Sequence, residues 1–179
     1  MVWGLLSIVP PLVSRHGNRG LALVIALLGS RLLFFSAKMT WFPFISTGLP
    51  TLAAAAVWGA STFSPVWWTA TVWPMVAMGL FYAHPATAGA YWYPVWWLSV
   101  PLFALVVREH PFVRAWRATM TAHTVGALWV LYVGNGYATL WHSLQYIVGV
   151  ERLCITLGML LVAYVDASWG QVIAGRERA

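Results

Sequence analysis

The chain has 179 residues, of which 61% are hydrophobic and only 8% are charged. A soluble domain usually carries about 25% charged residues, and a domain this small has too much surface to stay dissolved with so few. The composition excludes an ordinary soluble protein and predicts one membrane-embedded domain, 1–179. The net charge of +6 comes from basic residues beside apolar stretches. We therefore expect the lipid bilayer, and not nucleic acid, as a partner.

The chain begins with an apolar segment that is too short to cross a bilayer, since a crossing takes roughly 20 residues. This segment reaches Pro10 and Pro11 before any positive charge, unlike a secretory signal. We expect residues 2–13 to form an interfacial or half-inserted segment.

Six longer apolar stretches follow, and they predict an all-α, polytopic transmembrane helical bundle. In lipid, every backbone polar group must be satisfied internally, which continuous apolar runs achieve as helices. The expected crossings are 21–37, 41–62, 66–83, 90–107, 118–134 and 151–169.

The basic residues predict the orientation of these crossings. With six helices, seven of the ten basic residues fall on one side, which is the pattern of a cytoplasmic face. We therefore expect a multi-pass protein of the cell membrane with both termini cytoplasmic. Arg15 and Arg19 precede the first crossing, and Arg176 and Arg178 are the last two. The other three are expected in the loop between the fourth and fifth crossings, and they are Arg108, Arg114 and Arg117.

Two segments interrupt the regular pattern. Residues 136–150 are short and contain polar side chains, and a seventh crossing there would split the basic groups between the two faces. We expect them to form a re-entrant or surface helix on the outer side. Residues 38–50 contain two prolines and a glycine, so they predict either a broken, partly inserted outer loop or a kinked helix end.

Aromatic side chains are the most distinctive feature, with 13 tryptophans, many of them at the predicted outer ends. Tryptophan and tyrosine suit the membrane interface, so one interpretation is an aromatic belt. The alternative is an outward-facing pocket that stacks on a flat or cationic ligand. Its candidate residues are Trp41, Trp92, Trp96 and Trp141, with Trp92 and Trp96 on one helix face.

Arg31 lies inside the first predicted crossing, where a charge usually snorkels, has a partner or faces a water-filled site. Glu151 begins the last crossing on the same outer side and is the candidate partner, although it and Arg152 could instead meet headgroups or other helices. Arg31, His142 and Glu151 join the four tryptophans as candidate ligand-binding residues.

The sequence favours a non-catalytic protein without deciding the question. It contains no nucleotide-binding, hydrolase or metal-site motif, and Cys154 is the only cysteine. Haem ligation across a bundle needs two histidines at similar depth, whereas His123 is expected near the inner side and His142 near the outer side. No metal is expected, and the cofactor is left unknown.

Small residues recur on the first predicted helix at Ala22, Ala26 and Ser30, a stripe that lets helices approach closely. Together with six helices, cytoplasmic ends and the irregular 38–50 loop, this stripe resembles the substrate-binding S-components of energy-coupling factor transporters. That resemblance implies that the stripe docks another membrane subunit and that the loop covers a small-molecule ligand.

Three functions remain open. The first is a small-solute-binding subunit of a transporter with an outward-facing aromatic pocket. The second is a non-catalytic structural subunit of a larger membrane complex. The third is a membrane enzyme or redox carrier.

Overall fold

A computed structural model describes Pro50, residues 53–54, 57–58, 67–106, 110–134 and 138–176, with side chains described as far as Ser168. Within these ranges every regular element is a helix, in agreement with the all-α prediction. The interfacial segment, the first crossing and the 38–49 part of the predicted loop lie outside the described residues.

Among the described residues, the first continuous helix starts as η1 (Trp68–Val72) and continues as α4 (Trp73–Ala83). The wide turn of η1 directly precedes Pro74, which cannot donate a backbone hydrogen bond. The helix ends where His84 is extended ahead of Pro85, and the short η2 (Pro85–Thr87) follows. The Thr87 hydroxyl donates to the carbonyl of Phe81 at 2.7 Å and satisfies one of the last carbonyls of α4.

The predicted 90–107 crossing is helical only from Pro94. Turns occupy the residues before it, including Gly89 with a φ of +85°. The helix then runs through η3 (Pro94–Leu98) and α5 (Ser99–Val106), which together are shorter than a usual crossing. Proline is favoured at a first helical position, so Pro94 explains this late start.

The fifth predicted helix is α6 (Pro111–Tyr132), which begins seven residues earlier than expected. His110 caps it by accepting a hydrogen bond from the backbone N–H of Phe112 at 3.2 Å. Arg114 and Arg117 are therefore helical, and their assignment to a loop was wrong. The Arg114 guanidinium lies 5.7 Å from the Trp58 ring centre, a cation–π contact that accommodates a charge on the helix.

Two helices complete the chain. The predicted 136–150 segment contains α7 (Ala138–Leu144), which is far too short to cross a bilayer, followed by a turn. Helix α8 (Val148–Arg176) begins three residues before the predicted 151. Among the described residues, its stretch Val148–Ser168 is the one helix long and apolar enough to cross a membrane. The other five of the six predicted crossings therefore stay a prediction.

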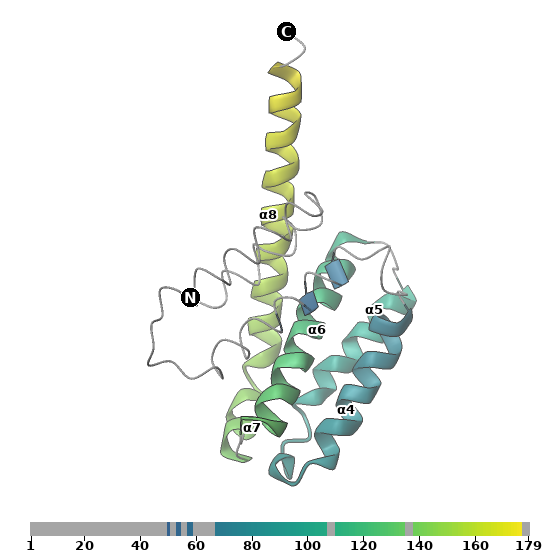
Figure 1. Ribbon diagram of the computed structural model, residues 1–179, viewed down its shortest axis with the longest axis vertical. Coiled ribbons are helices and arrows are strands. Elements are labelled where there is room, and N and C mark those ends of the chain that lie inside the picture. The colour runs from purple at the N-terminus through teal and green to yellow at the C-terminus, as the bar shows by residue number, and fades with distance from the viewer. Residues whose placement is uncertain are drawn as a thin grey trace.

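Helix α6 lies at the centre of the described bundle and packs against α4, α5 and α8, while α8 extends well past its neighbours (Figure 1). Alanines 115, 118 and 122 of α6 meet Ile155 and Met159 of α8, so small side chains permit a close approach. The Thr156 hydroxyl of α8 lies 3.3 Å from that of Thr119 on α6 and adds a polar contact to this interface.

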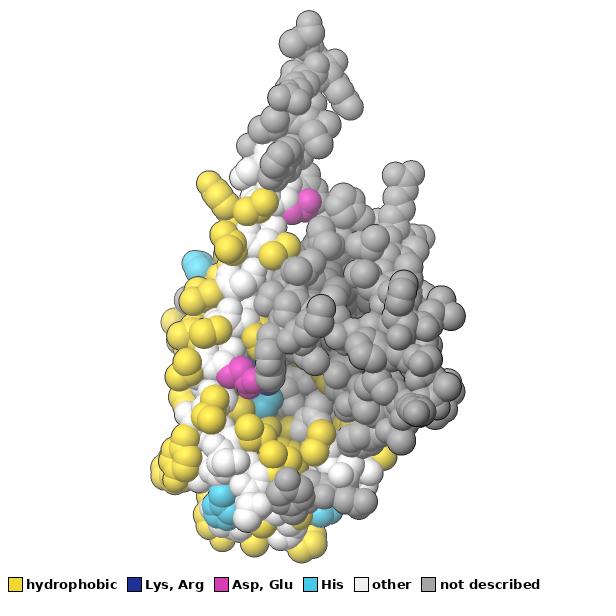
Figure 2. Space-filling view, turned by 90° about the vertical axis from the view of Figure 1, so that its left-hand side faces the viewer, with side chains coloured by type: hydrophobic (Ala, Val, Ile, Leu, Met, Phe, Trp, Pro, Cys, Tyr) yellow, Lys and Arg dark blue, Asp and Glu magenta, His cyan; other side chains and the backbone are white. Residues whose placement is uncertain are grey.

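Hydrophobic side chains cover much of the described surface on the face seen in Figure 2. On α8 the exposed ones include Leu153, Leu157 and Leu161. Exposed apolar surface of this extent is unusual for a monomeric soluble protein and suits contact with lipid or with other apolar helices.

Candidate functional site

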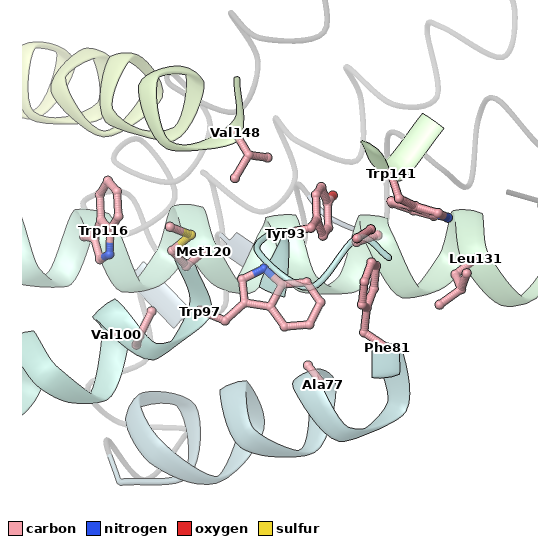
Figure 3. Packing of buried hydrophobic residues seen from close by; sticks show 12 residues of the cluster. Ala77, Phe81, Tyr93, Trp97, Val100, Trp116, Met120, Leu131, Trp141 and Val148 are labelled. Atoms are coloured by element: carbon pink, nitrogen blue, oxygen red, sulfur yellow. The ribbon is translucent and has the colours of Figure 1, made fainter. Parts of the chain in front are cut away.

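Five aromatic rings from five different segments meet inside the bundle, and we call this group the ring cluster. The ring cluster lies where the last turn of α4, the middle of α6 and α7 approach the turn before η3, and Figure 3 shows four of its members. All five side chains are buried. They are Phe81, Tyr93, Trp97, His123 and Trp141.

Tyr93 is the centre of the ring cluster. Its ring stacks on Phe81 with centroids 5.0 Å apart, and it meets Trp141 edge-on at 5.1 Å. The His123 imidazole lies 5.2 Å from Tyr93 and 6.1 Å from Trp97. Edge-on and stacked pairs at these separations each contribute about 0.5–1.5 kcal/mol beyond the area they bury.

An ion pair lies beside the ring cluster at the start of α8. The Arg152 guanidinium donates to the Glu151 carboxylate at 2.8 Å, and the arginine side chain is 7% exposed while that of the glutamate is 24% exposed. Arg152 also interacts electrostatically with Tyr93 and His123. The pair therefore has its positive end toward the rings and its negative end nearer the surface.

Burial dominates the acid–base behaviour of Tyr93, which lies in the turn before η3. Desolvation raises the pKa of its hydroxyl far above the ordinary value, while the charge of Arg152 lowers it and that of Glu151 raises it again by smaller amounts. The hydroxyl thus stays protonated at physiological pH and can donate a hydrogen bond.

Several polar atoms in and beside the ring cluster are buried without a hydrogen-bond partner among the described residues. They include Trp97 Nε1, Trp141 Nε1, His123 Nε2 and Gln145 Oε1. Leaving such an atom unsatisfied costs roughly 1–3 kcal/mol. Two of these atoms belong to the neighbouring rings of Trp97 and His123, whose centroids are 6.1 Å apart, and such a pair favours a bound molecule or water that supplies the missing partners.

A second set of rings lies on the surface at the same end of the bundle, and we call it the outer collar. The Tyr82 hydroxyl donates to the Tyr91 carbonyl at 2.7 Å, and that of Tyr132 donates to the Leu80 carbonyl at 2.8 Å, which holds these rings against the protein. The outer collar consists of the exposed side chains Tyr82, Tyr91, Trp92, Trp96, Tyr132 and Tyr146.

The structure separates the residues predicted to form one pocket. Trp141 belongs to the ring cluster, whereas Trp92 is 68% exposed and Trp96 is on the surface. The shared helix face predicted for Trp92 and Trp96 is wrong, because the helix starts only at Pro94. The exposed His142 packs beside Gly89, so that a Cβ there would lie 2.8 Å from its ring.

The remaining predicted residues divide in two groups. Glu151 pairs with its neighbour Arg152. The others lie outside the described residues, and so do their predicted roles in ligand binding and subunit docking. They are Arg31, Trp41, Ala22, Ala26 and Ser30.

Sequence reasoning missed most of the ring cluster. His123 was placed near the inner side, but the earlier start of α6 makes it the thirteenth of 22 residues, close to the rings of Tyr93 and Trp97. The sequence did contain a signal for two other members. Tyr93 and Trp97 are four residues apart, so on a helix they would share the face next to that of Trp92 and Trp96. Within the described ranges, no three His, Cys, Asp or Glu side chains gather closely enough to hold a metal ion.

Comparison with protein-family models, curated proteins and solved structures finds no significant match to this chain.

Proposed function

We propose that this chain is a multi-pass membrane protein whose helical bundle binds a small solute, as the substrate-binding subunit of a transporter. The proposed crossings among the described residues are 68–83, 94–106, 111–132 and 148–168, with both chain ends on the cytoplasmic side. The exposed leucines of α8 and the similar apolar surface of α4 and α5 support this placement.

The spacing of the exposed rings also supports it. The outer collar surrounds one end of the bundle, and Trp67 and Trp68 are exposed at the start of η1, toward the other end. About 14 residues of helix, from Trp68 in η1 to Tyr82 in α4, separate the two levels, or roughly 21 Å. The hydrocarbon core of a bilayer is about 30 Å thick, and tryptophan and tyrosine are enriched at both of its interfaces.

The ring cluster with its unsatisfied polar atoms carries the proposal of solute binding. A structural core would use apolar side chains or would pair its polar atoms, since no water in the membrane interior replaces a missing partner. The indole N–H of Trp97 and the Nε2 atom of His123 are both buried without such a partner among the described residues. A polar solute would satisfy both.

Purified full-length protein in mild detergent tests solute binding. We expect at least one compound in a panel of vitamins, cofactors and other small metabolites to raise the melting temperature. Trp97→Phe should reduce that rise, because it keeps a ring and removes the N–H. Trp92→Phe is the matched control on the surface, and a panel in which nothing stabilises the protein contradicts the proposal.

The surface of α8 favours a second candidate, a structural subunit of a larger membrane complex. Its exposed face contains Leu157, Leu161 and Tyr164, and the helix extends past the rest of the described bundle (Figure 1). Extraction in a gentle detergent distinguishes the two. Migration with a large complex supports the structural role, and a stable isolated monomer contradicts it. The resemblance to S-components is compatible with partner subunits in either case.

A further inference from the structure

Helix α7 continues into a turn, and we call residues 138–147 the α7 segment. It lies at one end of the bundle, where α8 begins (Figure 1). Two of its ten side chains are buried, those of Trp141 and Gln145, while Leu140 and Leu144 are partly buried against the core. A helix of seven residues is unstable alone in water, where isolated helices shorter than about 12–15 residues are marginal. The α7 segment therefore keeps its place and its helix through these few contacts.

Both buried side chains have a polar atom that lacks a hydrogen-bond partner among the described residues. These atoms are Nε1 of Trp141 and Oε1 of Gln145. The backbone N–H of Gln145 donates to the carbonyl of Trp141 at 3.1 Å, so the two side chains are one helical turn apart on the same face. Burying such atoms is unfavourable, because they give up hydrogen bonds to water. Exposure of this face would restore those bonds and offset part of the packing that is lost.

The ring of Trp141 closes this side of the ring cluster. It meets Phe81 edge-on with centroids 5.3 Å apart and Tyr93 at 5.1 Å, and Figure 3 shows it beside both. Trp97 and His123 contact Tyr93 from other elements. The rings are thus in contact with one another, and a molecule that enters the cluster must displace one of them. Withdrawal of Trp141 uncovers Phe81 and Tyr93 and leaves space for a molecule about as large as an indole.

The other contacts of the α7 segment are mainly with turns rather than with the long helices. Helix α7 packs chiefly against η2. The exposed His142 lies against Gly89, whose φ of +85° suits glycine. The carbonyl of Gln145 accepts a long hydrogen bond, at 3.4 Å, from the indole of Trp96. A segment with few buried apolar contacts can open locally at low cost, so this one can separate while α4, α6 and α8 stay packed.

We infer that the α7 segment is a lid over the ring cluster, and that it moves away from the bundle while the helices behind it stay folded. The movement carries Trp141 and Gln145 from the core into water. As the route to the cluster, the lid rests on the proposed solute-binding role: a solute takes the place of the Trp141 ring against Phe81 and Tyr93. The outer collar surrounds the same end of the bundle, so the solute would enter from the outer side.

Hydrogen–deuterium exchange of the full-length protein in mild detergent, read by mass spectrometry with no solute present, tests the lid. We expect the hydrogen-bonded amides of 138–147, that of Gln145 among them, to exchange at least about tenfold faster than those in the middle of α6. Gln145→Met should slow their exchange about tenfold, because methionine is similar in shape and has no strongly polar atom to leave unsatisfied in the closed state. Trp141→Ala should speed it more than about a hundredfold, because the buried ring is lost. The matched control is Tyr146→Phe, which removes a hydroxyl from an exposed side chain of the same segment and should change little.

Slower exchange in Gln145→Met is a gain of protection that a misfolded variant would not produce. The inference is overturned if the amides of 138–147 are as protected as those of α6, if Gln145→Met and Tyr146→Phe behave alike, or if Trp141→Ala leaves the exchange unchanged. Because no solute is present, the two proposals fail separately. If the lid is overturned, the panel of compounds still decides solute binding, and if no compound in the panel binds, the exchange rates still decide the lid.

Discussion

The ring cluster and the outer collar contain the same kinds of residue at the same end of the molecule, yet their surroundings are opposite. Trp97 is completely buried, whereas Trp92, five residues earlier, is 68% exposed. In the collar, the hydroxyls of Tyr82 and Tyr132 donate to nearby carbonyls, while the indole N–H of Trp97 has no partner among the described residues. Residue type alone thus does not separate an exposed ring from a packed one, and packing within the bundle does.

The largest expected difference between the two regions is in stability. Trp97→Ala removes a ring that touches Phe81, Tyr93 and His123, and should lower the free energy of unfolding by about 3–5 kcal/mol. Trp92→Ala should change it by less than about 0.5 kcal/mol. Denaturant unfolding of the detergent-solubilised variants measures both. Equal losses would contradict the division into cluster and collar.

The contact between the collar and α8 gives a smaller effect. A Cβ at Gly149 would lie 2.5 Å from the Trp96 ring, so Gly149→Ala should displace the ring and lower the free energy of unfolding by about 1–3 kcal/mol. Gly79→Ala is the matched control, because nothing lies within 4 Å of its Cβ, and it should stabilise α4 by about 1 kcal/mol. If Trp96→Ala does not relieve the effect of Gly149→Ala, the contact is not its cause.

The buried hydroxyl of Tyr93 predicts a dependence on alkaline pH. Burial raises its pKa in the folded state, so above pH 10, the ordinary tyrosine value, the unfolded chain loses a proton that the folded protein keeps. This contribution to stability is fully present below pH 10 and falls by up to about 1.4 kcal/mol per pH unit above it. Denaturant unfolding at pH 10 and at pH 11 measures the decline, and Tyr93→Phe should make it shallower.

The smallest effect concerns position in the bilayer and leaves stability unchanged. Lipids brominated near the headgroup should quench the fluorescence of collar tryptophans and not that of Trp97. In reconstituted protein, Trp92→Phe should therefore reduce the fraction of fluorescence that these lipids quench. Trp97→Phe should increase that fraction, because it removes an unquenched emitter. The reverse result would show that the outer collar is not at the membrane interface.

Some features could be predicted because they depend on local chemistry. Continuous apolar stretches predicted helices, and the helices over 68–83 and 148–168 agree with that expectation closely. Apolar periodicity did not reveal the start of α6, because Arg114 and Arg117 resembled loop residues. His110 and Pro111 form a capping signal there that outweighs the charges.

The candidate site was less predictable, because its members come from several helices and turns between Phe81 and Trp141. Trp92 and Trp96 were expected to act with Trp141, but Trp141 joins the neighbouring pair, Tyr93 and Trp97. Shifting a helix start by a few residues changes which ring faces the bundle, since each residue advances the face by about 100°. Because α6 starts earlier than predicted, His123 likewise lies closer to the rings than expected.

By itself, the sequence determined that this chain is helical, apolar and rich in rings, because composition and the length of apolar runs are local properties. Only the tertiary structure decided which rings are buried and which are exposed. It also placed the positive charge of Arg152 beside Tyr93 and His123. Helix ends and packing between distant segments set these relations, and neither can be read from the spacing of residues along one segment.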